Sequence, residues 1–160
     1  MAVDMFLKLE GIKGEAQDAK HKEEIDVLAW SWGLAQSGTT HMGSGSGAGK
    51  VSVQDLSITK YVDKASPTLA LYSCSGKHIP KGQLIVRKAG DKPLEYIKID
   101  LEDIIVSHLS LGGSGSEDRL TENVTLNFGK FKYVYTVQEK TGAAGAAPEC
   151  KWDIAKNESA

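Results

Sequence analysis

The sequence predicts an all-β protein, a barrel or sandwich of about eight or nine strands with one short helix. Short segments of alternating apolar and polar residues, separated by turns rich in Gly and Pro, recur along the 160 residues. Residues 66–75 alone combine a helix start signal with a helix stop signal. This length suits one domain, covering residues 1–160.

The longest alternating stretch is Arg119–Val137, and it changes phase in its middle. Apolar side chains occupy first the even positions and then the odd ones: Leu120, Val124, Leu126, Phe128, and then Phe131, Tyr133, Tyr135 and Val137. We favour a single strand bent at Gly129, because a phase slip needs a bulge or bend. The alternative is a hairpin, but Phe-Gly-Lys-Phe lacks the Asn-Gly or Asp-Gly turn signal.

Two strands are predicted near the N-terminus, Val3–Leu9 and Ile25–Gln36. In the second strand, Leu28, Trp30 and Trp32 share one face, and two tryptophans at this spacing predict a core face. The other face carries small side chains, among them Val27, Ala29 and Ser31. Such a face suits a packed interface or a lined channel, and simple exposure to solvent is the alternative.

Residues 38–50 form a Gly/Ser-rich loop that ends in Gly-Lys. A phosphate-binding loop would need Gly at position 44 and Ser or Thr at position 51. The chain has Ser44 and Val51 there, and no βαβ pattern surrounds the loop. We therefore expect a projecting loop, either flexible or reaching a partner.

The remaining elements follow in order. Val51–Tyr61 predicts a strand with Leu56 and Ile58 facing inward, and strands are also expected at residues 83–88, 94–101 and 104–111. The short helix is predicted from Ser66 as N-cap, Pro67 as first helical residue and Gly76 after the last turn. Its residues Leu69 and Tyr72 should face the body of the protein. Residues 141–150 are predicted to be a loose Ala/Gly segment, and Trp152 and Ile154 predict a short final strand.

The sequence offers little catalytic or metal-binding chemistry. The four histidines have no zinc-site spacing, so no metal or other cofactor is expected: they are His21, His41, His78 and His108. A hydrolase would require Glu102, Asp103 or Glu122 to converge, and no nucleophile or triad motif is present. Glu122 occupies an inward-facing position between Leu120 and Val124. Either it is paired with Arg119 or another basic residue, or the inward-facing core residues of this strand begin only at Val124. We favour the second explanation and expect a protein that is not an enzyme.

Charge and hydropathy limit the partners. A formal charge of −2 and a pI near 6.1 give no reason to expect nucleic acid. No apolar run approaches the ~20 residues of a membrane helix. The first residues, MAVDMFLKLEG, lack a basic n-region, which predicts no secretory signal peptide. Cys74 and Cys150 are therefore expected to be free thiols in a reducing compartment.

Five segments resemble the haemolysin-coregulated protein (Hcp) family of the bacterial type VI secretion system. They are AVDMFLKLEGIKGE, EEIDVLAWSWG, HMGSGSGAGKVSVQDLSITKYVDKASP, SGKHIPKGQLIVRKAG and LGGSGSEDRLTENVTLNF. The resemblance implies a compact β-barrel of two sheets with a flanking helix. It also implies a non-enzymatic subunit whose homo-hexameric rings stack into a tube that is expelled into target cells.

The resemblance also implies partners and sites. Small effector proteins would bind in the pore, and the tube would meet a spike protein and a contractile sheath. The small face with Val27, Ala29 and Ser31 becomes the candidate pore wall. The projecting loop becomes the candidate contact between subunits or rings, through Thr39, Thr40, His41, Met42, Gly43, Ser44 and Gly45. The competing interpretations are a monomeric ligand-binding barrel and a small hydrolase on a β-scaffold.

Overall fold

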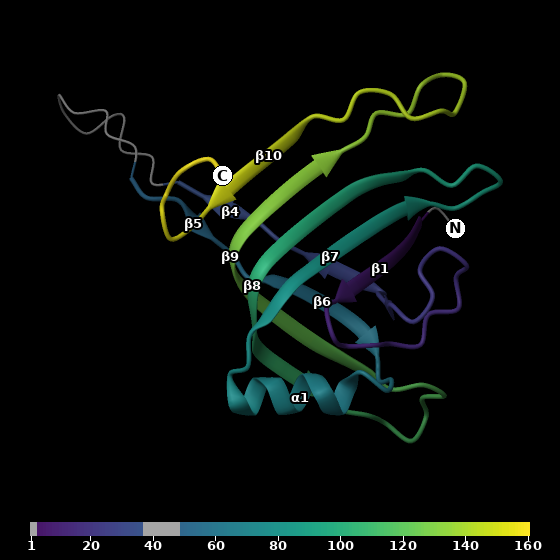
Figure 1. The fold of residues 1–160 in the computed structure, drawn as a ribbon. Coiled ribbons are helices and arrows are strands. Elements are labelled where there is room, and N and C mark those ends of the chain that lie inside the picture. The colour runs from purple at the N-terminus through teal and green to yellow at the C-terminus, as the bar shows by residue number, and fades with distance from the viewer. Residues whose placement is uncertain (1–2, 37–48) are drawn as a thin grey trace.

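The computed structural model describes residues 3–36 and 49–160, which fold mostly as antiparallel strands (Figure 1). Within these ranges there are two sheets and one short helix, so the predicted fold class is confirmed. The elements are β1 Val3–Leu9, β2 Ile25–Asp26, β3 Ala29–Ser31, β4 Leu34–Ala35, β5 Ser52–Val53, β6 Leu56–Tyr61, α1 Ser66–Ser75, β7 Ile79–Lys88, β8 Glu95–Leu111, β9 Thr121–Tyr135 and β10 Glu149–Asp153.

The larger sheet holds eight strands in the order β2-β1-β7-β8-β9-β6-β3, with β10 added beside β9. The long strands β8 and β9 pair along most of their length. β9 pairs with β6 through its first half and with β10 through its second half. The sheet therefore curls about β8 and β9 into a half-barrel, as Figure 1 shows. We call the part with β3 and β6 the first half-sheet, and the part with β1, β7 and β10 the second half-sheet.

β9 is one continuous strand, which confirms the predicted bend and rules out the hairpin. Its buried positions are even up to Phe128 and odd at Phe131, so the inward face changes at Gly129. The strand then continues in register with β8 on one side and with β10 on the other. A single strand can therefore contribute core residues to both half-sheets.

The neighbouring strand β8 makes the same change of face. Its buried positions are odd up to Leu101 and even from Ile104 onward. Between them, Asp103 has a φ of +57°, which is uncommon for a residue with a side chain. The pairing of the flanking residues places Asp103 directly opposite Gly129. The sheet thus bends along a line that crosses both central strands.

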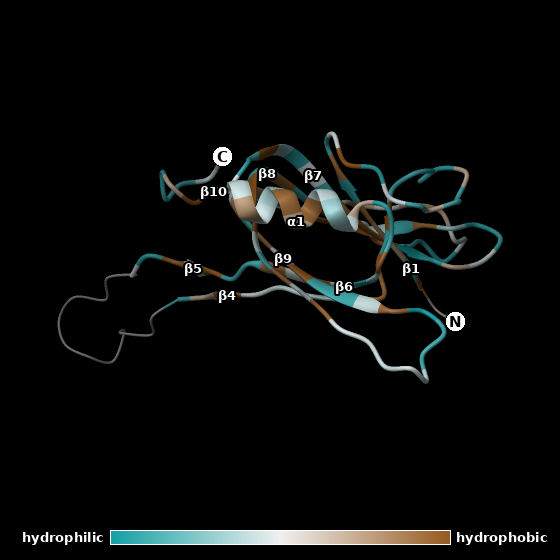
Figure 2. Cartoon of the chain, turned by 90° about the horizontal axis from the view of Figure 1, so that it is seen from below, coloured by the Kyte–Doolittle hydropathy of each residue, from teal (hydrophilic) through white to brown (hydrophobic). Residues whose placement is uncertain are grey.

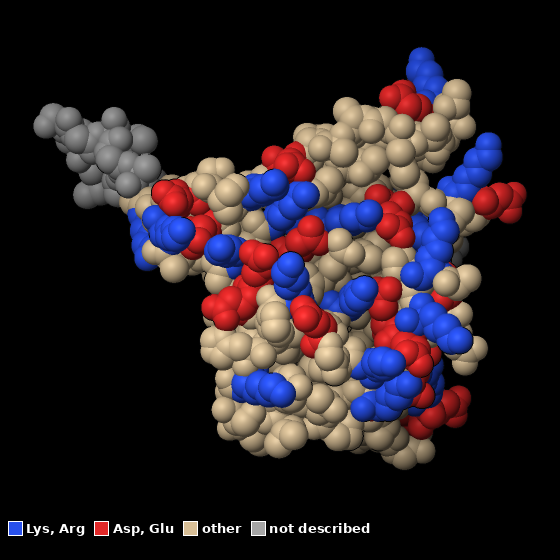
Figure 3. Space-filling view, viewed as in Figure 1, with Lys and Arg blue, Asp and Glu red and all other residues tan. Residues whose placement is uncertain are grey.

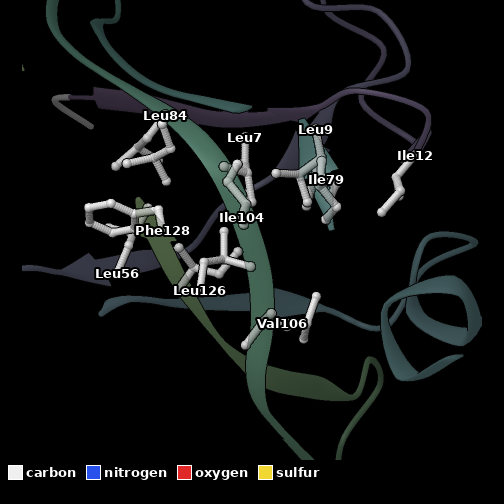
Figure 4. Packing of buried hydrophobic residues seen from close by; sticks show 14 of the residues in the cluster. Leu7, Leu9, Ile12, Leu56, Ile79, Leu84, Ile104, Val106, Leu126 and Phe128 are labelled. Carbon is white, nitrogen blue, oxygen red and sulfur yellow. The ribbon is translucent and has the colours of Figure 1, made fainter. Parts of the chain in front are cut away.

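The core lies inside the curl and is built from aliphatic side chains of both half-sheets (Figure 4). Leu7 and Leu84 of the second half-sheet are fully buried together with Leu56 and Leu126 of the first. Aromatic rings extend this core near the bend, where Trp32 meets Phe131 edge-on at 4.9 Å between ring centroids. Burying such side chains is worth roughly 1.5–3 kcal/mol each and drives the closure of the curl.

The helix α1 ends where the sequence predicts and begins one residue earlier than predicted. Pro67 stands in its first turn, and Gly76 ends it with a φ of +68°. Gly76 donates its backbone N–H to the carbonyl of Tyr72, as a left-handed C-terminal cap does. Leu69 is fully buried and Tyr72 packs against the core, which confirms the predicted inward face.

The predicted N-cap is wrong by one residue. Ala65 occupies the cap position, and Ser66 is the first residue of the helix. The hydroxyl of Ser66 instead donates to the buried carboxylate of Glu122 and accepts from the backbone N–H of Asp63. Its oxygen also accepts from Lys60 Nζ, so both acceptor lone pairs are used and none is left for a helix N–H.

Four of the predicted strands are divided or merged in the structure. The strand expected at Ile25–Gln36 is divided into β2, β3 and β4, and the one expected at Val51–Tyr61 into β5 and β6. The two strands expected at residues 94–101 and 104–111 are one strand, β8. The separate sheet of β4 and β5 runs out from the body of the molecule (Figure 2).

The segment 141–150, predicted to be loose, is tied to the end of β9. Val137 donates to the carbonyl of Ala146, Glu139 donates to that of Ala143, and Glu149 and Cys150 belong to β10. The predicted final strand exists, although it ends at Asp153. Cys74 and Cys150 are exposed free thiols. Among the described residues, no helix is both long and apolar enough to span a membrane.

Candidate functional site: a small polar sheet face

The outer face of the first half-sheet carries mostly small, polar side chains in register across four strands. One row runs from Ala29 on β3 to Thr59, Asn123 and Ser110 on the neighbouring strands. The next row begins at Ser31 and contains Ser57, Thr125 and His108. We call this surface the polar face; besides these two rows it includes Ser107 and Asn127.

Side chains of the polar face hydrogen-bond to one another. Thr59 donates to the amide oxygen of Asn123 at 2.8 Å. At the end nearer β5, Asp55 accepts from Ser107 at 2.7 Å and from Asn127 at 2.9 Å. These contacts pair donors and acceptors between neighbouring side chains of the polar face.

The predicted pore-wall residues are not all on this face. Ala29 and Ser31 lie on it and are exposed, as expected. Val27 does not, because the chain turns between β2 and β3 and its side chain is only 6% exposed within the core. Its backbone N–H bonds to the carbonyl of Met5 on β1, which breaks the alternation that the prediction assumed. The assignment of Val27 to an open face is therefore wrong.

The predicted core face of the same segment is partly right. Trp30 and Trp32 are half-buried and pack against the core, whereas Leu28 is 40% exposed. The same turn in the chain explains the difference, since strict alternation holds only within β3.

The loop residues predicted to contact neighbours lie outside the described residues, from Thr39 to Gly45. The structure does describe the base of this loop. Leu34 and Ala35 of β4 pair antiparallel with Val53 and Ser52 of β5. The loop therefore starts and ends on paired strands.

The second half-sheet has an outer face of a different character. Lys8, Gln83, Asp100, Lys132 and Lys151 form one cross-strand row. Figure 3 shows basic and acidic side chains interleaved over β7 to β10. Oppositely charged groups meet there, and a surface groove of about 540 Å³ runs between them. The two outer faces thus differ sharply in charge.

The acids that a hydrolase would need do not converge. Glu102 and Asp103 are exposed at the bend of β8, while Glu122 is buried on β9 beside Ser66. Among the described residues there is no group of three or more His, Cys, Asp or Glu side chains placed to hold a metal ion. In the described part of the molecule, these acids do not form an assembled catalytic group.

Two of the described histidines have carboxylate partners. The ring nitrogens of His21 lie 2.8 Å from Glu24 and 2.6 Å from Glu95. Burial opposes ionisation of Glu95, but hydrogen bonds from His21 and Lys98 outweigh it, and the pKa of Glu95 is lowered. His78 meets Asp103 at 2.6 Å on the surface. These pairs fix the loop before β2 and the bend of β8.

The alternative that pairs Glu122 with a base other than Arg119 is confirmed, although sequence reasoning did not favour it and did not name Lys60. Glu122 is paired with Lys60, which contradicts the favoured explanation that its strand enters the core only at Val124. The sequence does contain a sign of this pair. Lys60 occupies the next inward-facing position after Leu56 and Ile58, and Glu122 occupies the inward-facing position before Val124. Two opposite charges in the inward phase of different strands signal a buried pair, although the sequence does not say that these two strands are adjacent.

Three kinds of comparison agree on the relatives of this chain. A family model described as "Type VI secretion system effector, Hcp" matches residues 6–135. "Protein hcp1" of Pseudomonas aeruginosa is 55% identical over 159 residues, 98% of each chain. The crystal structure of Hcp1 from Salmonella typhimurium has a TM-score of 0.82 at 40% identity and covers all of both chains. A type VI secretion system effector from Yersinia pestis has a TM-score of 0.77 at 38% identity, covering 94% of this chain and 100% of the other.

Proposed function

Because this chain belongs to the Hcp family of type VI secretion system tube proteins, we propose that its polar face lines the lumen of the tube. Members of the family form hexameric rings that stack, and they chaperone effector proteins. They are structural proteins and not enzymes. The family thus supplies the assembly, and the polar face suggests which surface of this chain meets the cargo.

The observation that carries the proposal is the register of small polar side chains across β3, β6, β9 and β8. A lumen wall must present a smooth surface to proteins of different shape, which favours short side chains that adapt their hydrogen bonds. Ala29, Ser31 and Ser57 meet this requirement. The charged face of the second half-sheet points away across the core, toward the outside of such a tube.

The proposal extends to the other partners of the tube. Small effector proteins would bind inside the ring, and the spike protein and the contractile sheath would contact the assembled tube. Proteins of this family are secreted by the type VI system. We propose that this chain is made in the bacterial cytoplasm and leaves by that route.

The loop at residues 38–50 is proposed to contact a neighbouring subunit or the next ring, through the residues from Thr39 to Gly45. Support comes from its base, where the paired strands β4 and β5 carry the chain away from the core. Replacing residues 39–45 by a short Gly-Ser linker should leave the fold intact and weaken ring formation or stacking, as measured by electron microscopy.

The lumen assignment is tested with Ser31→Gln, which adds a longer side chain to the polar face. The matched control is Ser73→Gln at an exposed position of α1. Native mass spectrometry should show six copies of the 17.2 kDa chain for both variants. Pull-down of co-expressed type VI effectors should fall with Ser31→Gln and not with Ser73→Gln. A Ser31→Gln chain that fails to assemble, or rings that capture cargo unchanged, contradict the proposal.

A further inference from the structure

A bulge in β8 turns the side chain of His108 onto the polar face. The pairing of β8 with β9 shifts in register between Val106 and His108. Val106 is buried, so strict alternation would bury His108 as well. Instead Ser107 and His108 are both exposed, and His108 lies opposite Thr125. Leu109 packs against the core in its place, as happens where a bulge adds one residue to a strand.

Of the residues that form the polar face, His108 alone can carry a charge near neutral pH. The others are alanine, serine, threonine and asparagine. His21 and His78 are held by carboxylates, whereas the ring of His108 has no hydrogen-bond or ion-pair partner among the described residues. Its two ring nitrogens are therefore available to a molecule that lies on the polar face.

The elements around His108 supply one acidic group. Across the sheet lie Thr125 of β9 and, beyond it, Ser57 of β6, which are uncharged. The helix α1 packs beside β8 and has no charged residue along SPTLALYSCS. Asp55, which precedes β6, accepts a hydrogen bond of 2.7 Å from Ser107, the neighbour of His108. With a neutral imidazole the polar face thus borders on the negative charge of Asp55, and a protonated imidazole offsets that charge.

We propose that His108 selects effector proteins with an acidic surface as cargo, and that their capture strengthens as the pH falls. The inference rests on the proposed function, since the lumen of a hexameric ring brings six copies of His108 to face one cargo. A concave wall that carries charges of one sign focuses its electric field on whatever lies inside. Imidazole side chains in general gain a proton at about pH 6.5, so modest acidification adds positive charge to this wall. Acidic cargo is then attracted, and basic cargo is repelled.

Peptides of opposite charge test this selectivity directly. The probes are a fluorescent oligoglutamate and a fluorescent oligolysine of the same length, added to purified rings at about pH 7.5 and about pH 5.5, on either side of the imidazole range. Fluorescence anisotropy should show that oligoglutamate binds about tenfold more tightly at the lower pH, because several exposed charge pairs, each weak alone, act together. Oligolysine should bind less tightly there. His108→Asn should remove most of both changes.

Two variants control for the other charges of the chain. His108→Lys keeps a positive charge on the polar face at both pH values, so its rings should bind oligoglutamate tightly at both. His78→Asn removes an exposed histidine that pairs with Asp103 at the bend of β8 and does not belong to the polar face. Its rings should respond to pH as the unmodified rings do. Native mass spectrometry checks that every variant forms six-copy rings.

Failure of the role of His108 differs from failure of the proposed function. Unmodified rings that bind oligoglutamate equally at both pH values overturn the role of His108, and so do His108→Asn rings that keep the full pH response. In either case the lumen assignment stands if Ser31→Gln still lowers effector capture. If Ser31→Gln rings capture effectors unchanged, the proposed function itself fails.

Discussion

Lys60 and Glu122 form an ion pair in the interior, with Lys60 Nζ 2.5 Å from Glu122 Oε1 and exposed side-chain fractions of 0% and 1%. The ammonium also donates to Asp63 and Ser66, and Ser66 donates to the same carboxylate oxygen. The pair joins β6 to β9 and both to the start of α1. A charge in this position is tolerated only because its partners are present.

Removing one member of this pair should be costly. We expect Lys60→Met to lower the free energy of unfolding by about 3–5 kcal/mol, because Glu122 would remain buried without its cation. The double variant Lys60→Met with Glu122→Leu should recover most of that loss. Urea titrations of both variants measure the effect.

The control for this comparison is Lys151→Met, which removes an exposed pairing with Glu149. Its effect should be within about 1 kcal/mol. If Lys60→Met and Lys151→Met destabilise equally, the buried pair does not have the stabilising role that its geometry indicates.

Acid should weaken the attachment of the loop before β2. Hydrogen bonds from Arg87 lower the pKa of Asp18 far below its usual value, against the opposing effect of burial. The carboxylate therefore binds protons more readily in the unfolded chain, so its contribution is complete above about pH 4 and is lost as the pH falls below that. Asp18→Asn should flatten the fall in stability between about pH 4 and pH 2, measured by thermal unfolding in a pH series. An unchanged slope would show that Asp18 is not responsible.

At position 103, in the bend of β8, glycine should be tolerated better than alanine. Asp103 has a φ of +57°, a conformation that costs a residue with a Cβ about 1 kcal/mol and glycine almost nothing. Asp103→Ala should destabilise the protein by about 1 kcal/mol, since alanine keeps the strain and loses the contact with His78. Asp103→Gly should be closer to neutral. Glu102→Ala, at the exposed neighbouring position, is the control and should change stability by less than about 0.5 kcal/mol.

The polar face should act as a surface rather than through one residue. Thr125 lies in the same cross-strand row as Ser31, two strands away. Thr125→Gln should therefore reduce effector capture about as much as Ser31→Gln, with six-copy rings preserved. Full capture by Thr125→Gln rings would restrict the cargo contact to β3.

Local pattern was sufficient for several parts of this fold. The alternation of Val3–Leu9 gave β1 with its observed bounds, and Pro67 with Gly76 predicted the helix. The phase change at Gly129 predicted a bent strand, because side-chain direction along a strand depends only on neighbouring residues. The resemblance of five segments to the Hcp family identified the assembly that the comparisons support.

Tertiary structure decided what depends on residues far apart in the chain. Lys60 and Glu122 meet because β6 pairs with β9, and no local pattern states that pairing. Val27 is buried because the chain turns toward β1, where its backbone bonds to Met5. The polar face exists because the registers of four strands align. Strand partners and registers are chosen by the packing of the whole core, so alternation alone determines which way a side chain points but not what it meets.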